Sequence, residues 1–267
     1  MYKSFYSLSK NPFQKDITTD ELYGSSTVKE CRARLDYLKD TRGFGVVSGE
    51  PGSGKTTALR AFRDSLSEAL FKVMYFPLST GTVMDFYRGM ASGLGEMPCF
   101  RKVDLFAQIQ KAVYSLFREK KITPVFILDE MHLCGNMFLQ DLNILFNYNM
   151  DSENPFILIL CGQPLIEDRF TLSHNQSLSQ RVVMRYHMEP MTKDEVTAYV
   201  EHHLKLAGAN HKIFTEDALE AIASLSRGWP RLINNLATSC LLYGCQHKKE
   251  LIDQDVVRSV SFDAGVR

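Results

Sequence analysis

The residues best suited to chemistry lie in the stretch GEPGSGKTT, which falls between a predicted strand and a predicted helix. It fits the phosphate-binding pattern GxxxxGK[ST] in full. Backbone N–H groups of such a loop surround phosphates, helped by the positive end of the following helix. We expect Lys55 to reach the β- and γ-phosphates of ATP and Thr56 to bind Mg²⁺. The residues expected to contact the nucleotide in this stretch are Gly49, Glu50, Pro51, Gly52, Ser53, Gly54, Lys55, Thr56 and Thr57.

A second stretch, PVFILDEMH, is an apolar run that ends in two carboxylates. We expect Asp129 to be the acidic partner of Mg²⁺ and Glu130 to orient and deprotonate the attacking water. Such a pair can also be only the N-cap of a helix. Downstream of a phosphate-binding loop, the Asp–Glu order favours an additional-strand ATPase over a GTPase or a small-molecule kinase. DEMH also resembles the DExH signature of helicases, but we expect 267 residues to be too few for two motor domains.

Three further polar side chains are candidates for sensing the nucleotide. Gln163 follows the apolar run FILILCG, and a polar residue beside the acidic strand can detect the γ-phosphate. Arg181 begins the mixed run RVVMRYHM, and Arg231 lies at the start of a helix predicted from Pro230 onward. The alternative interpretation is a turn glutamine and two solvated surface arginines.

Composition limits the class of protein. The 31 basic and 31 acidic residues cancel, so any nucleic-acid binding must come from local clustering of charge. The six cysteines show neither CxxC spacing nor a paired framework, as is typical of reduced thiols in a cytosolic protein. The N-terminus lacks the apolar core of a signal peptide, and the longest apolar runs are too short to span a bilayer. We therefore expect a soluble, cytoplasmic protein with no membrane segment.

The spacing of apolar residues predicts an α/β fold. Five runs bounded by turn residues indicate strands at residues 44–48, 72–78, 124–129, 156–162 and 181–188. Helical patterns, such as the one over 56–70, separate them, which indicates a parallel sheet covered on both faces. From a capping box at Thr192 and Glu195 onward only helical patterns occur. We predict an α/β base over residues 1–190 and a small all-α lid over residues 191–267.

Together these motifs resemble those of an AAA+ ATPase. The matching features are the loop, ILDE, the strand end CGQ, the arginine in SQRV, and GxxRxIN in a helical lid. NPF (Asn11–Phe13), LYGSS and CGQP are more similar to the ExeA/TniB/TnsC group, which includes ATP-binding proteins that assist DNA transposases and ATPases of secretion-pathway assembly. The resemblance covers nearly the whole chain and implies a P-loop AAA+ fold with a five-stranded parallel sheet and a C-terminal helical lid.

The resemblance also implies roles for matching positions. Arg181 would be an arginine finger inserted into the ATP of a neighbouring subunit, with Arg185 as its competitor. Arg231 would contact the γ-phosphate of its own subunit's ATP. Tyr23, within the N-terminal segment 1–30, would line the adenine pocket together with the lid. A finger that acts in trans implies a homo-oligomer, either a ring or a helical filament.

Local charge allows contact with duplex DNA. Basic side chains outnumber acidic ones between residues 101 and 121: Arg101, Lys102, Lys111, Arg118, Lys120 and Lys121 against Asp104 and Glu119. Such an excess can bind phosphates without reading base sequence, although a solvated helix face is the alternative. The resemblance directs this region towards the pore of an oligomer.

Two functions follow from the resemblance. Secretion-type members carry a membrane span and a peptidoglycan-binding domain after the ATPase, whereas we expect this chain to stop after the lid, at Arg267. We therefore predict an ATPase that oligomerises on duplex DNA and recruits or activates a transposase. The alternative is an ATPase of a secretion or membrane-assembly system that acts on protein partners without DNA.

Overall fold

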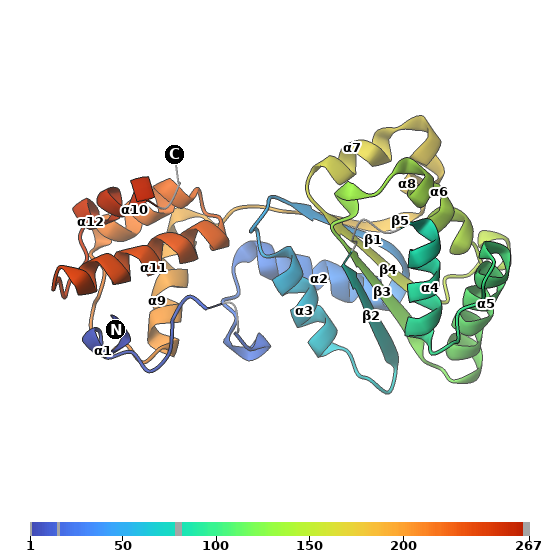
Figure 1. The fold of residues 1–267 in the computed structure, drawn as a ribbon, viewed down its shortest axis with the longest axis horizontal. Coiled ribbons are helices and arrows are strands. Elements are labelled where there is room, and N and C mark those ends of the chain that lie inside the picture. Colours follow the sequence, from blue (N-terminus) through green and yellow to red (C-terminus); the bar gives the residue numbers. More distant parts are fainter. Residues whose placement is uncertain (1, 15–16, 78–81, 264–267) are drawn as a thin grey trace. The chain divides into compact units, whose positions relative to one another are not determined.

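A computed structural model describes residues 2–14, 17–77 and 82–263 (Figure 1). The chain forms two compact units, each with its own hydrophobic core. The α/β unit holds residues 31–51 and 55–188. The helical unit holds residues 1–30, 52–54 and 189–267.

The α/β unit is built on a five-stranded parallel sheet in the order β2-β3-β4-β1-β5. Its strands are β1 (Gly43–Gly49), β2 (Phe71–Pro77), β3 (Thr123–Asp129), β4 (Ile157–Gly162) and β5 (Val182–Met188). The five strands predicted from apolar runs are confirmed, and Leu78 of the second run lies outside the described residues. The central strands β1, β3 and β4 are buried along their whole length, as expected when helices cover both faces of a sheet.

Helices cover both faces of the sheet (Figure 1). The helices of this unit are α2 (Ser26–Thr41, whose first turn lies in the helical unit), α3 (Lys55–Ser65), α4 (Val83–Leu94), α5 (Lys102–Tyr114), α6 (Asn136–Leu145), α7 (Leu165–Thr171) and α8 (Gln176–Arg181). On one face, side chains such as Phe44 and Phe126 share a core with α4, α5 and α6. On the other face, a Cβ at Gly45 would lie 2.5 Å from Cδ2 of Leu38 in α2, so this close packing requires glycine.

One predicted helix is shorter than its apolar pattern. The pattern predicted a helix over 56–70, but α3 spans Lys55–Ser65. The Ser65 hydroxyl donates to the carbonyl of Phe62, and a side chain that bonds to the backbone in this way competes with the helical ladder. Leu70, the last residue of that pattern, is 55% exposed.

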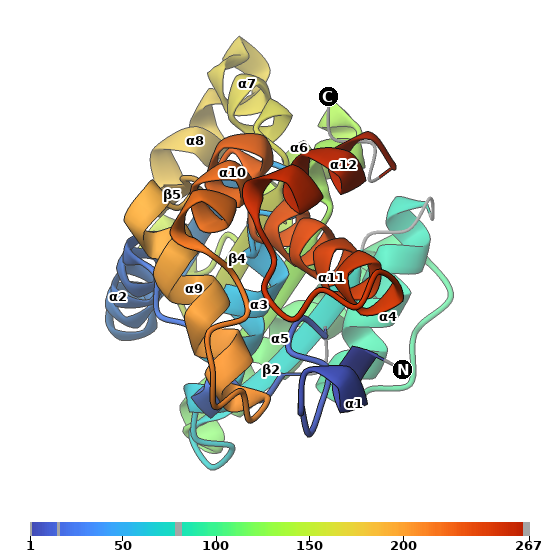
Figure 2. The same ribbon diagram turned by 90° about the vertical axis from the view of Figure 1, so that its left-hand side faces the viewer.

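The helical unit contains α1 (Tyr2–Phe5), α9 (Lys193–Leu206), α10 (Glu216–Ser226), α11 (Pro230–Gln246) and α12 (Gln254–Asp263) (Figure 2). The predicted capping box of α9 is present: Glu195 N–H donates to Thr192 Oγ1 at 3.3 Å, and Thr192 N–H donates to Glu195 Oε2 at 3.0 Å. Tyr6, Leu8 and Phe13 are buried in the core of this unit. The N-terminal segment, which the sequence analysis grouped with residues 1–190, thus packs with the C-terminal helices.

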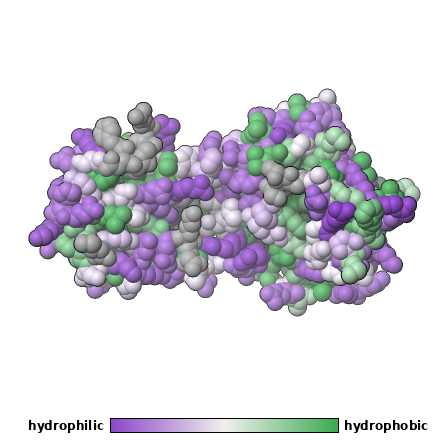
Figure 3. Space-filling view, in the orientation of Figure 1, coloured by the Kyte–Doolittle hydropathy of each residue, from purple (hydrophilic) through white to green (hydrophobic). Residues whose placement is uncertain are grey.

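Hydrophobic residues lie among hydrophilic ones on the face shown in Figure 3. The most exposed large apolar side chains include Met97, Phe100 and Val103 of the α/β unit, at 90%, 84% and 78% exposure. Within the part of the chain that the structure describes, no helix is both long enough and apolar enough to span a membrane.

Candidate active site

The predicted phosphate-binding loop connects β1 to α3. Gly52 and Gly54 have φ angles of +87° and +97°, in the left-handed region that glycine adopts without steric cost. Lys55 begins α3 and is buried, and its Nζ donates to the carbonyls of Gly49 at 2.8 Å and Glu50 at 3.0 Å. The strand–loop–helix arrangement that the motif predicted is therefore present, and the loop carbonyls hold the ammonium group against the loop.

Asp129, at the end of β3, is the centre of a polar cluster. It is 3% exposed, and its Oδ2 accepts hydrogen bonds from Thr56 Oγ1 at 3.0 Å and from the Tyr75 hydroxyl at 2.9 Å. Its Oδ1 accepts the N–H of Glu130 at 2.9 Å. A hydroxyl and a carboxylate are the hard oxygen ligands that Mg²⁺ prefers. The structure brings Thr56 and Asp129 together, and this donor set fits the ion.

Two neighbours of Asp129 were missed by the sequence analysis. Tyr75 lies on β2, paired with Ile127 two residues before Asp129. Burial, followed by the bond to Asp129, raises the pKa of Tyr75, so its hydroxyl stays a donor. Cys161, on β4, is fully buried beside the same carboxylate, and burial raises the pKa of its thiol. Both residues lie beside Asp129 because β2 and β4 flank β3, an order for which the sequence gives no signal.

Glu130 directly follows the strand in a left-handed conformation, with φ 58° and ψ 32°, which is uncommon for a residue with a Cβ. Its side chain is 52% exposed, so water can reach the carboxylate. His132, in the short 3₁₀ helix Met131–Leu133, is buried, and its Nδ1 lies 3.4 Å from Glu130 Oε2. The backbone N–H of Gln163, just after β4, donates to the same Nδ1 at 3.3 Å. The structure thus brings Gln163 and Glu130 to a shared neighbour.

The two candidate fingers differ in how they are held. The Arg181 side chain is 12% exposed, lies over the Phe44 ring, and pairs with Asp151 at 2.8 Å. Its guanidinium also donates to the carbonyls of Asn143 at 2.8 Å and Phe146 at 2.6 Å. Burial lowers the pKa of Arg181, against the opposing charge of Asp151. Arg181 is therefore held by several partners within its own chain.

Arg185, on β5, is more accessible. Its side chain is 36% exposed, and its guanidinium pairs with Glu167 at 3.0 Å and donates to the Ser179 hydroxyl at 2.7 Å. It also lies over the ring of Phe170. Phe170 is buried, but Glu167 is 34% exposed and one carbonyl, that of Ser179, accepts from Arg185, whereas two carbonyls accept from Arg181.

The helical unit holds the other two predicted nucleotide contacts. Arg231 is exposed at the start of α11, and its N–H donates to the carbonyl of Gly52 at 3.3 Å. A Cβ at Gly52 would lie 2.6 Å from the Arg231 Cβ, so the loop residue must be glycine there. The Tyr23 ring packs against Tyr199 and His202 of α9, with 5.7 Å between ring centres in both cases. Within the helical unit, the structure therefore brings Arg231 to Gly52, and Tyr23 to α9.

Residues 38–170, which include the loop, Asp129, Glu130 and Gln163, match the family model described as "AAA domain". These residues form an AAA domain. The loop and the acidic strand end, from which this kind of domain was predicted, both lie within the matched residues.

The similarity to known proteins extends beyond the AAA domain to the rest of the chain. The chain is similar to General secretion pathway protein A of Aeromonas hydrophila, with 30% identity over 272 residues. That match covers 100% of this chain and 49% of the relative, so the chain spans about half of the relative's length.

Solved structures share the fold of the AAA domain and the helices that follow it. Cdc6p from Pyrobaculum aerophilum has a TM-score of 0.70 and 18% identity, over 95% of this chain and 70% of that chain. ORC1 of Aeropyrum pernix, solved in complex with DNA, has a TM-score of 0.67 and 16% identity, over 94% and 68%. The RuvB Holliday junction branch migration motor of Thermotoga maritima has a TM-score of 0.58 and 20% identity, over 94% and 72%. The predicted P-loop AAA+ fold is thereby confirmed.

Three of the basic side chains suggested for DNA contact are ion-paired on the AAA domain. The pairs are Arg101 with Asp104 at 2.7 Å, Lys102 with Asp141 at 2.8 Å, and Arg118 with Glu153 at 2.5 Å. Asp141 and Glu153 lie outside the segment that the sequence analysis counted. The local excess of positive charge is therefore smaller than the sequence indicated, and Lys111, Lys120 and Lys121 remain as exposed cations of that segment.

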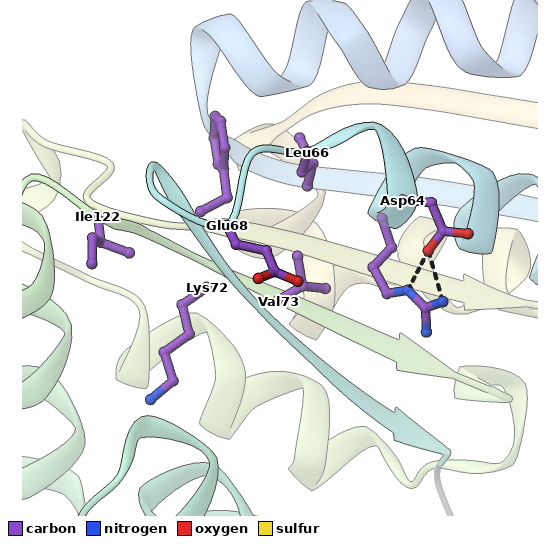
Figure 4. Close-up of a pocket in the computed structure, with 8 residues that line it drawn as sticks. Asp64, Leu66, Glu68, Lys72, Val73 and Ile122 are labelled. Atoms are coloured by element: carbon purple, nitrogen blue, oxygen red, sulfur yellow. Dashed lines mark hydrogen bonds and ion pairs between the residues drawn. The ribbon is translucent and has the colours of Figure 1, made fainter.

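A hollow of about 550 Å³ lies at the other end of β2 from Asp129 (Figure 4). Its lining residues are Arg63, Asp64, Leu66, Glu68, Phe71, Lys72, Val73 and Ile122. Arg63 and Asp64 pair at 2.7 Å, and Lys72 Nζ donates to the carbonyl of Leu94 at 2.9 Å. None of these residues was predicted to bind nucleotide, and the hollow is separate from the candidate active site.

Proposed function

We propose that this protein hydrolyses ATP to ADP and phosphate in a Mg²⁺-dependent reaction, and that it works as a homo-oligomer. The observation that carries the proposal is the contact between Thr56 Oγ1 and Asp129 Oδ2 at 3.0 Å, with Glu130 next in the chain. It joins the phosphate-binding loop to the acidic strand end, which together make a phosphoryl-transfer site.

Each residue of the site has a proposed task. The loop N–H groups and Lys55 bind the phosphates, and Thr56 and Asp129 hold Mg²⁺, which neutralises charge on the phosphates when it is bound. Glu130, half-exposed at the strand end, orients a water molecule and accepts its proton. Gln163 and Arg231 detect the γ-phosphate, and Tyr23 contributes to the adenine pocket.

The accessibility of Arg185 supports it as the residue that acts on a neighbouring subunit, in place of Arg181. We expect Arg185→Ala to lower ATPase turnover by about 10³-fold, because an arginine finger contributes on that scale. Arg181→Ala should instead lower the free energy of unfolding by about 3 kcal/mol, since it leaves the carbonyls of Asn143 and Phe146 without their donor, while the half-exposed Asp151 contributes little. Steady-state ATPase assays and denaturant titrations measure the two effects.

A mixing experiment checks that Arg185 acts in trans. Arg185→Ala subunits keep Glu130, and Glu130→Gln subunits keep Arg185, so mixed oligomers should regain turnover that neither variant has alone. Lack of recovery on mixing would refute action between subunits. A stable but inactive Arg181→Ala protein, beside an active Arg185→Ala protein, would reverse the assignment.

As binding partners of this oligomer, we propose duplex DNA and a transposase that the DNA-bound oligomer recruits or activates. The fold shared with ORC1, a protein solved in complex with DNA, and the exposed Lys111, Lys120 and Lys121 support DNA contact. Backbone contacts without sequence preference are expected, since lysines bind phosphates as point charges. The transposase rests on the resemblance to the ExeA/TniB/TnsC group.

A second candidate is an ATPase of a secretion or membrane-assembly system that binds protein partners. The 30% identity to General secretion pathway protein A favours it. Gel shifts and negative-stain images with long duplex DNA, with and without a non-hydrolysable ATP analogue, separate the two functions. ATP-dependent coating of DNA, weakened in a Lys120→Ala/Lys121→Ala variant, supports the first proposal. Indifference to DNA at low salt, with ATPase activity intact, would favour the second.

A further inference from the structure

His132 lies between Glu130 and Gln163, two residues of the proposed site. Its Nδ1 is 3.4 Å from Glu130 Oε2 and 3.3 Å from the N–H of Gln163. Glu130 is the proposed base, and Gln163 is the proposed sensor at the end of the neighbouring strand. The His132 side chain is only 9% exposed, so its ring is packed in place and is not a mobile surface group.

The backbone around His132 keeps the ring at this position. The left-handed conformation of Glu130 turns the chain out of β3, and the Glu130 carbonyl accepts the N–H of Leu133 at 3.0 Å to close the 3₁₀ turn. On the β4 side, a Cβ at Gly162 would lie 3.1 Å from the backbone N of His132. That distance is tighter than an ordinary contact, so glycine lets the turn that carries His132 approach the end of β4.

One ring nitrogen cannot serve both neighbours at once. To accept the Gln163 N–H, Nδ1 must present its lone pair, and it then has no proton to donate to Glu130. To donate to the Glu130 carboxylate, Nδ1 must carry a proton, and the backbone N–H of Gln163 then loses its acceptor. The two hydrogen bonds are therefore mutually exclusive. The bond from Gln163 leaves the Glu130 carboxylate released, and the bond to Glu130 holds it.

We propose that His132 is a positioning residue through which the end of β4 at Gln163 controls the orientation of Glu130. When the backbone N–H of Gln163 donates to Nδ1, the ring lone pair repels the Glu130 carboxylate, which is then free to orient water. When that N–H moves away, the ring proton can shift from Nε2 to Nδ1, and Nδ1–H then donates to the carboxylate and holds it. This inference rests on the proposed function of Glu130 and Gln163, and it adds the link between them.

The test compares three substitutions at one position. His132→Ala removes the link, His132→Phe keeps a ring without nitrogen, and His132→Asn places an amide close to the position of Nδ1. We expect His132→Ala and His132→Phe to lower kcat by about tenfold, because the Glu130 carboxylate loses the ring nitrogen that directs it towards water, with the Kd for a non-hydrolysable ATP analogue within twofold of the parent value. His132→Asn should recover most of kcat. A purely structural role would instead be rescued by Phe and not by Asn, which would overturn the proposal.

A double-mutant cycle with Glu130→Gln supplies the decisive readout. In the Glu130→Gln background, His132→Ala should change the residual kcat by less than twofold, because the group it positions has been removed. An undiminished tenfold loss in that background would overturn the coupling. If Glu130→Gln alone hydrolyses ATP normally, the proposed function of Glu130 fails, which is a separate outcome. Melting temperatures check folding, and if His132→Ala fails to fold, the Asn and Phe variants carry the test.

Discussion

Lys55→Ala is expected to bind ATP about 100-fold more weakly than the parent protein and to lose ATPase activity. The Lys55 ammonium lies against the loop, within 3.0 Å of the carbonyls of Gly49 and Glu50, where phosphate oxygens can replace those acceptors. A charged hydrogen bond in a buried setting contributes about 1.5–3 kcal/mol, and the upper part of that range corresponds to 100-fold in affinity. Titration with a fluorescent ATP analogue in the presence of Mg²⁺ measures the effect.

The matched control is Lys39→Ala, in the same unit. Lys39 pairs with Asp36 on the surface of α2 and has no predicted nucleotide role, so its loss should leave ATP affinity unchanged. Lys55→Ala leaves the carbonyl of Gly49 at the buried end of β1 and that of Glu50 at an exposed residue, so a melting temperature checks that the variant folds. Normal ATP affinity in folded Lys55→Ala would contradict the placement of the phosphates at this loop.

The sheet and the loop could be predicted because their signals are local. A buried parallel strand is a short apolar run between turn residues, and β1, β3 and β4 are such runs. The loop motif needs its glycines for backbone angles, and Gly52 and Gly54 adopt φ values that few other residues tolerate. The capping box at Thr192 and Glu195 depends only on a spacing of three residues.

What could not be predicted depends on contacts between distant segments. Tyr75 belongs beside Asp129 only because β2 lies next to β3, and no spacing in the sequence specifies that order. The burial of Arg181 arises from carbonyls and a carboxylate about 30 to 40 residues earlier in the chain. A lone arginine in the sequence gives no sign of such partners, which is why Arg181 and Arg185 could not be distinguished.

The positive charge of the segment 101–121 could also be predicted only in part, because some of its partners lie in distant segments. The count of basic residues between 101 and 121 was correct, but Lys102 and Arg118 pair with Asp141 and Glu153 from other elements. Because exposed ion pairs are weak, such lysines and arginines can still exchange a carboxylate for a phosphate. The pairs therefore lower the expected DNA affinity without removing the surface, and DNA binding should fall steeply as salt rises.

Glu130→Gln is expected to reduce kcat at least 100-fold while ATP affinity stays within twofold, because the amide has nearly the same shape as the carboxylate but cannot accept the proton of water. The Glu130 backbone is left-handed, and glutamine bears the same strain there, so the melting temperature should not change. The variant should accumulate in the ATP-bound state. Nucleotide retained after gel filtration, together with a single-turnover assay, measures both effects.

Glu130→Gln should also change the oligomer if ATP controls assembly. An oligomer that forms with ATP and comes apart after hydrolysis should be locked together by Glu130→Gln, so the variant should sediment as a larger species that persists, whereas Lys55→Ala should stay small. Glu201→Gln, at an exposed position of α9, is the matched control and should behave like the parent protein. If Glu130→Gln hydrolyses ATP at the normal rate, the base lies elsewhere. If it fails to retain ATP, the carboxylate acts in binding and not in the proton transfer, because proton transfer contributes nothing to ground-state affinity.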